Sequence, residues 1–291
     1  MGGMVIDLHV IFKGLQGVFM KIGIVLVTYS MVPEKLFKSI EEKTTHACRW
    51  YIHHHGQDQI LITPLQTISG KYDARLYLHM FNRGLARSWN DGIGESLTDA
   101  NDLTLVINDD IEFIEDGFDR FMQFIDVSGP DVGLAFLRGI EGNKSPLAGE
   151  IRSQDFGCFV ISKKAINQIG FFDENFVPAY YEDFDYAWRM AMAGVKKIVD
   201  ERPLVIHDRG NTTRSDPRLK ENIDKYVWLC RHYITKKWGV DTWRINDMYD
   251  HPFGNDKYDF RIAWENRHTP YGPGYDRDDL NVLRMLLQDN D

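Results

Sequence analysis

Short apolar runs that end in polar residues alternate with amphipathic segments along most of the sequence. The run 21–29 is rich in β-branched residues and has the pattern of a strand buried on both faces. The next segment, 33–43, places Leu36, Phe37 and Ile40 at helical spacing. Strands that alternate with helices are typical of an α/β fold with a largely parallel sheet.

The same alternation predicts further elements. The expected strands are 50–54, 76–79, 102–107, 132–136, 158–161 and 197–206, and the expected helices are 82–97, 116–125, 163–170, 182–194 and 224–238. No repeat and no Pro- or Ser-rich linker is visible before residue 215. We therefore predict one continuous domain over residues 20–215, with residues 1–19 as an N-terminal appendage and residues 216–291 as a C-terminal extension.

Composition narrows the class of function. Lys and Arg total 34 against 43 Asp and Glu, and the net charge of −9 disfavours a protein that binds nucleic acid through its phosphates. The three cysteines, Cys48, Cys158 and Cys230, suit neither a disulfide framework nor a C-x-x-C metal site, so we expect a reducing, cytoplasmic location. No stretch of ~20 uncharged apolar residues occurs, so we predict no membrane span.

Two terminal segments stand apart from this pattern. Residues 1–19 carry no motif and lack the features of a signal peptide, and Met20 directly precedes the first strand, so we expect them to be dispensable. The extension is rich in aromatic residues and holds four of the seven tryptophans. Its rings either pack onto the core or form a surface that stacks on a sugar or base of the acceptor, with Trp243 and Trp264 as candidates.

An acidic turn follows the expected strand 102–107. Asn108, Asp109 and Asp110 stand at the carboxyl end of that strand, where open α/β sheets bind their ligands. Carboxylates there can hold Mg²⁺ or Mn²⁺, which favour oxygen ligands and bridge to phosphates. Acidic turns after strands are also common without any metal.

Two other polar positions are candidates for chemistry. Glu182 and Asp183 begin a predicted helix, where a carboxylate can serve as a general base, although acidic residues in a first helical turn also occur simply because they complement the helix dipole. His207 follows a predicted strand, and a single histidine is usually structural. It gains a metal-binding role only if it lies near Asp110.

The remaining signals are weaker. Asn82-x-Gly84 and Asn90-x-Gly92 frame a turn where backbone can approach a ligand closely. Adjacent residues of a strand point to opposite faces, so the histidines at 53–55 cannot all bind one ion; we expect structural roles or contacts to a nucleotide edge, with His54 as the candidate. Cys158 is expected to be a buried thiol. The sequence contains no P-loop, G-x-G-x-x-G, H-E-x-x-H or G-x-S-x-G motif.

The order of these signals resembles that of the family 2-like glycosyltransferases with the GT-A fold. The resemblance covers roughly residues 21–215, and its most specific parts are segments 171–176 and 180–189. The matched positions are the first strand, Asn82-x-Gly84 with Asn90-x-Gly92, Asn108-Asp109-Asp110, Gly157, Asp173-Glu174-x-Phe176, Glu182-Asp183-x-Asp185 and His207. The resemblance implies a metal-dependent enzyme that moves a sugar from a nucleotide-sugar to an acceptor hydroxyl with inversion.

The resemblance also implies roles for individual residues. The positions that match the family's nucleotide cradle are Thr28, Tyr29, Asn82, Gly84 and Asn90. In the family's D-x-D motif, Asn108 takes the first place and Asp110 the last, so Asp110 contacts Mn²⁺ or Mg²⁺, and Asn108 or Asp109 lies nearer the ribose or a metal-bound water. His207 matches a later metal ligand. Asp183 matches the general base, with Glu182 beside it.

Where many relatives have an Asp–Asn–Gly–Ser-like turn that contacts the base, this chain has His53-His54-His55-Gly56. We expect a UDP-sugar donor and an acceptor of the glycan type. A hydroxymethylated base of DNA is an alternative acceptor. A catalytically inactive nucleotide-sugar-binding module is the alternative of another class, disfavoured because such a module does not need Asp110, Asp183 and His207 together.

Overall fold

A mixed β-sheet forms the centre of the molecule. The computed structural model describes residues 20–141, 156–207, 217–238 and 261–267. Within these ranges the sheet has eight strands in the order β3-β2-β1-β4-β7-β6-β8-β5. The strands are β1 (Lys21–Thr28), β2 (Ala47–His55), β3 (Arg75–His79), β4 (Leu103–Asn108), β5 (Ile111–Phe113), β6 (Leu134–Glu141), β7 (Cys158–Ile161) and β8 (Lys197–His207).

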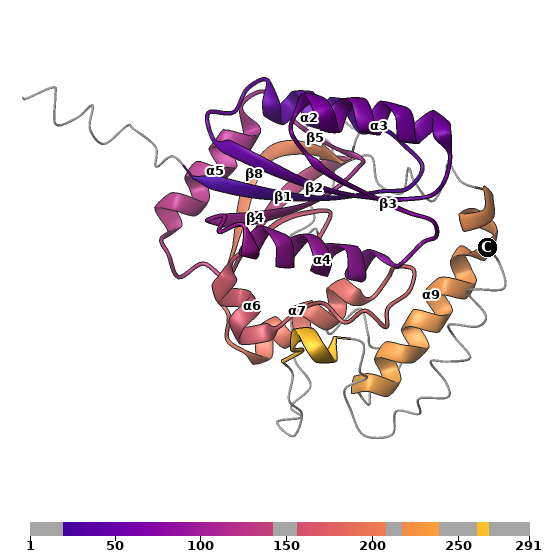
Figure 1. Ribbon diagram of the computed structural model, residues 1–291. Helices are drawn as coiled ribbons and strands as arrows, with labels where there is room; N and C mark the ends of the chain where they lie inside the picture. Colours follow the sequence, from indigo (N-terminus) through magenta and orange to yellow (C-terminus); the bar gives the residue numbers. More distant parts are fainter. Residues whose placement is uncertain (1–19, 142–155, 208–216, 239–260, 268–291) are drawn as a thin grey trace, which may run out of the picture.

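Helices cover both faces of this sheet (Figure 1). α2 (Glu34–Glu41), α3 (Gln59–Lys71) and α5 (Gly117–Ser128) lie on one side, and α4 (Leu85–Thr98), α6 (Lys163–Ile169) and α7 (Glu182–Met192) lie on the other. The alternation of side chains along β1 explains both layers. Ile22, Ile24 and Leu26 belong to the core beneath α2 and α5, whereas Val25 and Val27 belong to the core beneath α4.

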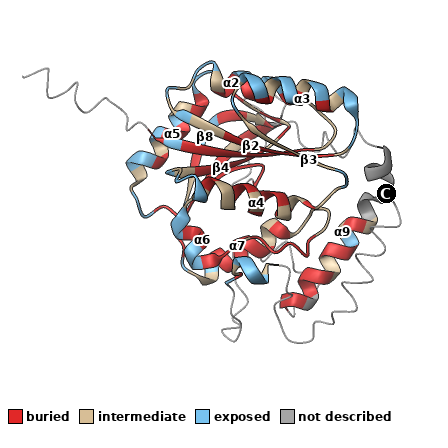
Figure 2. Ribbon diagram, viewed as in Figure 1, coloured by how far each residue is buried: buried red, intermediate tan, exposed pale blue. Residues whose placement is uncertain are grey.

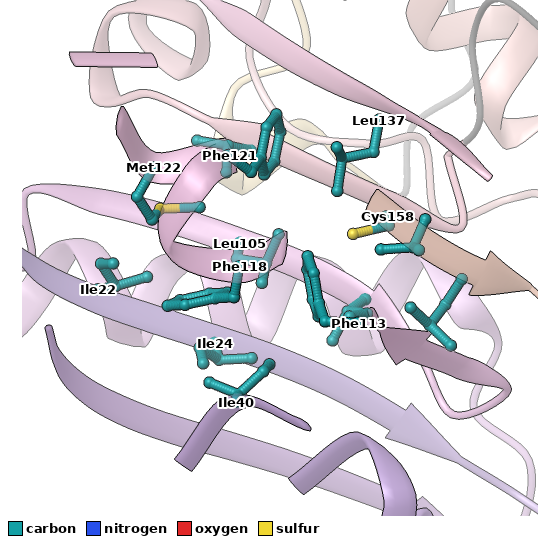
Figure 3. Packing of buried hydrophobic residues seen from close by; sticks show 14 of the residues in the cluster. Ile22, Ile24, Ile40, Leu105, Phe113, Phe118, Phe121, Met122, Leu137 and Cys158 are labelled. Atoms are coloured by element: carbon teal, nitrogen blue, oxygen red, sulfur yellow. The ribbon is translucent and has the colours of Figure 1, made fainter. Parts of the chain in front are cut away.

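Aromatic residues fill much of the first of these cores. Figure 3 shows Phe113, Phe118 and Phe121 gathered over Ile24 and Leu105, and all of them are buried. Phe113 and Phe118 meet edge to face with ring centroids 5.4 Å apart. β5 and α5 are therefore held to the sheet by ring packing as well as by strand pairing.

Most strands of the sheet run in the same direction. β1 is parallel to β2 and β4, and β2 is parallel to β3. β7 is antiparallel to both β4 and β6, so β6 runs in the same direction as β4, and β8 is parallel to β6. The carboxyl ends of β1, β2, β3, β4, β6 and β8 consequently lie at one edge, which we call the carboxyl edge.

α9 (Pro217–Trp238) packs beside α7 through a third apolar cluster. Cys230, Tyr233 and Trp238 of α9 contact Phe176 and Trp188 there, and Figure 2 shows the buried positions along the described part of this helix. The short segment 261–267, which includes η2 (Trp264–Asn266), joins the same region: the Phe171 N–H donates to the Ile262 carbonyl at 2.9 Å.

A buried ion network joins α9 to α7. The Lys237 ammonium lies 2.7 Å from Asp173 Oδ2 and 2.6 Å from Asp185 Oδ1, and both carboxylates are fully buried. Arg189 pairs with the other oxygen of Asp185 at 2.9 Å. Although burial alone raises the pKa of Asp185, Lys237 and Arg189 hold it below its usual value. Both cations therefore favour the ionised form of the buried Asp185 carboxyl.

The structure confirms the predicted α/β fold with a mostly parallel sheet, and it adds α3, β5 and the short η2. The sequence did not predict α3, because Pro64 and several β-branched residues obscure its helical pattern. Asp58 caps this helix by accepting a hydrogen bond from the Ile60 N–H at 2.9 Å. β5 is too short to show periodicity.

Residues 1–19 lie outside the described part, and the domain boundary predicted at residue 215 stays a prediction. No helix in the described ranges is long and apolar enough to span a membrane.

The ion network generates a stability prediction. Replacing Lys237 with Met is expected to lower the free energy of unfolding by about 3–5 kcal/mol, because Asp173 and Asp185 then remain buried without their shared cation. Urea unfolding measures the change. The control is Lys164→Met, whose partner Asp131 lies 2.6 Å away in a largely exposed pair; it should leave stability close to wild type. Equal, small losses in both variants would contradict this account of the network.

Candidate active site

The carboxyl edge has a switch in strand order beside β1. The chain runs from β1 to β2 on one side, whereas β4 pairs with β1 on the other side. Ligands of open α/β sheets bind outside such a point. Thr28, at the end of β1, and Asn108, at the end of β4, lie at this position because Val27 pairs in register with Asn108.

Asp110 and His207 lie together at the same edge. The turn Asp109–Asp110 links β4 to β5, and β5 pairs antiparallel with β8 so that Ile111 faces His207. Asp110 Oδ1 is 3.1 Å from His207 Nε2, and their side chains are only 7% and 8% exposed. Asp109 is also buried. Two residues nearly a hundred positions apart in sequence therefore form the mixed carboxylate–imidazole pair on which the predicted role of His207 depends.

This pair fits a divalent cation as two of its ligands. Adjacent ligands about 2.1 Å from one ion lie about 3 Å apart, close to the observed separation. The described residues contain no group of three or more His, Cys, Asp or Glu side chains placed to hold a metal. A cation here would take further ligands from a bound phosphate group or water, as Mg²⁺ sites commonly do.

Thr28 and His54 pair at the ends of β1 and β2. Both are buried, and they are register partners. The Thr28 hydroxyl donates to the Met31 carbonyl at 3.0 Å and lies 3.2 Å from His54 Nδ1. Burial lowers the pKa of His54, so its imidazole is neutral near pH 7. Tyr29 follows Thr28 and is half-buried.

Asn82 and Gly84 build the turn that leads into α4. Asn82 Oδ1 accepts from the Gly84 N–H at 2.9 Å and lies 3.1 Å from His55 Nδ1. Gly84 has a φ of 91°, a conformation that favours glycine. The next amide, that of Leu85, donates to the Pro178 carbonyl at 2.7 Å. This turn is therefore fixed against the loop that precedes α7.

Asn90 links α4 to the segment that precedes α7 through hydrogen bonds of its side chain. It is fully buried in α4, its Nδ2 donates to the Phe172 carbonyl at 2.8 Å, and its Oδ1 accepts from the Phe172 N–H at 2.9 Å. Its side chain also donates to Glu174 at 3.0 Å. Asn90 thus holds the segment that carries Asp173 and Glu174 against α4.

Glu182 and Asp183 border a pocket of about 250 Å³ at the start of α7. The pocket is lined by Tyr180, Tyr181, Glu182, Asp183, Phe184 and Val227. Tyr180 and Tyr181 have φ values of 86° and 69°. Left-handed backbone at two successive bulky residues is costly, and such strain is concentrated at functional sites. Glu182 and Asp183 follow these two residues directly, and both line the pocket.

The two carboxyls have different environments. Glu182 is buried, and desolvation, together with the charge of Asp183, raises its pKa to about 8. Glu182 is therefore mainly protonated at neutral pH, whereas Asp183 is only partly buried. A pair of carboxyls in contrasting environments suits the division of acid and base roles.

The structure thus assembles the predicted residues into two groups. The strand-end group contains Thr28, His54, Asn108, Asp109, Asp110 and His207, and the pocket group contains Glu182 and Asp183. Sequence reasoning missed the other four lining residues, Tyr180, Tyr181, Phe184 and Val227. Val227 belongs to α9, and its place depends on the packing of α9 against α7, which no local motif encodes.

Trp264, a predicted acceptor contact, is engaged within the fold. The Arg267 guanidinium lies 3.5 Å from its ring centroid, and Phe171 meets it edge to face at 4.9 Å. Arg267 is itself bonded to Glu174. Trp264 nevertheless remains 38% exposed, so its role as an acceptor contact stays a prediction. Trp243 lies outside the described residues.

Comparison with known proteins identifies the fold. No family model matches the chain. The mannosyltransferase PcManGT from Pyrobaculum calidifontis, solved with GDP-Man and Mn²⁺, aligns with a TM-score of 0.51 and 12% identity over 76% of this chain and 72% of its own. GalNAc-T7, solved with UDP, GalNAc and Mn²⁺, aligns at 0.54 and 12% over 79% of this chain and 54% of its own. TarS of S. aureus aligns at 0.54 and 11%, over 81% and 45%.

These alignments confirm that the chain has the GT-A fold that the motif order predicted. One sequence relative is more similar over a short stretch. A protein named galactofuranosyl glycosyltransferase from Leishmania donovani is 51% identical over 55 residues, which make up 19% of this chain and 13% of that protein.

The buried histidines beside the site predict an acid-sensitive fold. Burial, with the nearby His79 and Arg83, lowers the pKa of His53 and of His55 to about 3, from 6.5 when exposed. The unfolded chain binds more protons between these values, so stability is lost as pH falls below 6.5. From pH 7 to pH 5 we expect a loss of about 2 kcal/mol for each histidine.

Urea unfolding at both pH values measures this loss. His55→Gln, whose amide can still bond to Ser88, should show a smaller loss than wild type. An unchanged pH dependence in that variant would contradict the account.

Proposed function

We propose that the protein is a metal-dependent, inverting glycosyltransferase that moves a sugar from a nucleotide-sugar, with UDP favoured, to an acceptor hydroxyl. The observation that carries the proposal is the Asp110–His207 pair, 3.1 Å apart at the carboxyl edge of a GT-A sheet. The structural relatives solved with nucleotides, sugars and Mn²⁺ support the same function.

In this proposal Asp110 and His207 would hold Mn²⁺ or Mg²⁺, and Asn108 or Asp109 would lie toward the ribose or a metal-bound water. A cation bound there would supply positive charge against the diphosphate leaving group. Thr28, Tyr29, His54, Asn82 and Gly84 border the nucleotide. Asn90 contributes indirectly, by holding the Phe172 backbone through its two hydrogen bonds.

Asp183 is the proposed general base. Its carboxylate accepts the proton of the acceptor hydroxyl while that oxygen forms a bond to the anomeric carbon. The bond from the anomeric carbon to the diphosphate oxygen breaks, and the diphosphate leaves with the electron pair. Attack from the side opposite the leaving group inverts the anomeric centre. Burial and the neighbouring charge of Asp183 raise the pKa of Glu182, so Glu182 is the weaker candidate for the base.

The pocket at α7 is the proposed acceptor site. Its walls combine the rings of Tyr180, Tyr181 and Phe184 with two carboxyl groups. Flat rings stack on sugar faces, and carboxyls bond to hydroxyls, so a glycan acceptor fits this composition. Because Val227 completes the wall, α9 takes part in acceptor binding rather than only in stability.

The two carboxyls supply the experiment. Asp183→Asn should keep nucleotide-sugar binding but lower kcat by a factor on the order of 10²–10⁴, because the amide cannot accept a proton. Glu182→Gln resembles a protonated Glu182 and should retain most activity. Release of nucleoside diphosphate from a panel of nucleotide-sugars with Mn²⁺, and mass spectrometry of glycan acceptors, measure both.

The pair of variants also shows how the proposal fails. If Glu182→Gln loses as much activity as Asp183→Asn, the two carboxyls do not have separate roles. If wild-type protein with Mn²⁺ releases no diphosphate from any nucleotide-sugar, the proposed reaction is wrong.

A further inference from the structure

Trp228 is the most exposed tryptophan in the described part of the chain. It is 62% exposed, whereas Trp264 is 38% exposed and the other four described tryptophans are buried. Tryptophan is highly buried on average in globular proteins, because its fused rings carry a large apolar area. Trp228 directly follows Val227, the residue of α9 that lines the pocket at the start of α7. An exposed indole therefore stands next to the proposed acceptor site.

The imidazole of His232 packs against this indole. The two rings are parallel to within 5°, and their centroids lie 5.5 Å apart, which is an offset stack. Trp228 and His232 are four residues apart in α9, so they share one side of the helix. An offset stack leaves part of each ring face open. The pair, which we call the ring platform, therefore offers a wider flat surface than either ring alone.

The ring platform lies beside the column of α9 that faces the pocket. Val227 and Arg231, also four residues apart, form this column, and Val227 lines the pocket. Burial raises the pKa of Tyr181, another pocket residue, and Arg231 is close enough for its charge to oppose that rise. Trp228 is three residues from Arg231, which places their Cβ atoms about 5–6 Å apart, close to the length of one sugar residue. A sugar in the pocket and a sugar on Trp228 can therefore belong to neighbouring positions of one glycan chain.

The opposite side of α9 is fixed in the core. Cys230, Tyr233 and Ile234 belong to the buried cluster that joins α9 to α7. Lys237 adds its ion pairs with two buried carboxylates. The ring platform consequently keeps a fixed position relative to α7, and a ligand that binds there orders little of the protein, which favours affinity.

The surroundings favour a neutral glycan over other occupants. A second copy of the chain needs far more area than one indole supplies, since stable interfaces bury about 800 Å² on each partner. Trp228 is the only exposed large apolar residue among the α9 side chains that the structure describes. A nucleic acid would bring its phosphates toward the carboxyls of Glu182 and Asp183, which line the adjoining pocket. A neutral sugar carries no such charge, and its apolar face can stack on an aromatic ring.

We propose that the ring platform is a second sugar subsite, so that the acceptor is an oligosaccharide whose terminal residue occupies the pocket while the preceding residue stacks on Trp228. This inference rests on the proposed function, because the pocket is the acceptor site only in that proposal. It narrows the acceptor to a chain of at least two sugars, which a separate glycosyl transfer must build beforehand. Trp228 is then a specificity-determining residue.

Transfer to gluco-, galacto- and manno-oligosaccharides of one, two and three residues, with a panel of nucleotide-sugars and Mn²⁺, tests the subsite. For wild-type protein, KM in the preferred series should fall by about 10-fold or more from one residue to two, because only the longer acceptor can stack on the indole. Trp228→Ala should reduce this difference to within about 2-fold by raising KM for the two-residue acceptor, with kcat nearly unchanged. Trp228→Tyr keeps a ring and should restore most of the difference.

Val127→Ala is the matched control, because Val127 is also an exposed apolar residue but belongs to α5, on the other side of the sheet. It should keep the wild-type dependence of KM on acceptor length. Circular dichroism and urea unfolding check each variant. Since Trp228 is exposed, Trp228→Ala should fold and unfold close to wild type. A large loss of stability would show that the indole is packed, and it would overturn the inference.

The outcomes separate the inference from the proposed function. Transfer with equal KM for acceptors of one and two residues, or a length dependence that Trp228→Ala retains, overturns the inference and leaves the function standing. Release of nucleoside diphosphate without transfer to any oligosaccharide, or with transfer only to hydroxymethylated DNA, does the same. A wild-type dimer that Trp228→Ala converts to a monomer assigns the platform to an interface between copies and also overturns the inference alone. Failure to release diphosphate from any nucleotide-sugar overturns both.

Discussion

The common direction of six strands is the constraint on which the site depends. Both faces of the sheet are covered by apolar cores, so polar side chains on the strands are displaced to their ends. Because the strands run the same way, these ends meet at one edge. The β5–β8 pairing then brings His207 against Asp110. A site of distant residues thus follows from strand direction and pairing alone.

The pocket group depends on charges that are buried on the same helix. Lys237 joins Asp173 and Asp185, which ties α9 to the helix that begins with Glu182 and Asp183. Buried ion pairs contribute little net stability compared with apolar packing, but they tolerate only one arrangement of their partners. The network therefore holds α9, which carries the pocket residue Val227, against the helix that carries Glu182 and Asp183.

The sequence was sufficient to predict the fold class and most elements, because strands buried on both faces and amphipathic helices have distinct periodicities. The prediction missed elements whose periodicity is weak, namely α3 with its internal Pro64 and the short β5. Motif order selected Asp110, His207 and Asp183 as candidates, and the structure brings Asp110 and His207 together. The sequence could not predict the contact between Thr28 and His54, the burial that raises the pKa of Glu182 or the wall formed by Val227, since each arises from contacts between distant segments.

Crystals grown with UDP and Mn²⁺, with diffraction data collected above the manganese absorption edge, test the central claim most directly. The account predicts an anomalous peak in contact with the Asp110 carboxylate, the His207 imidazole and the diphosphate, with the base toward the end of β2. A manganese peak or a nucleotide bound away from the carboxyl edge would contradict it.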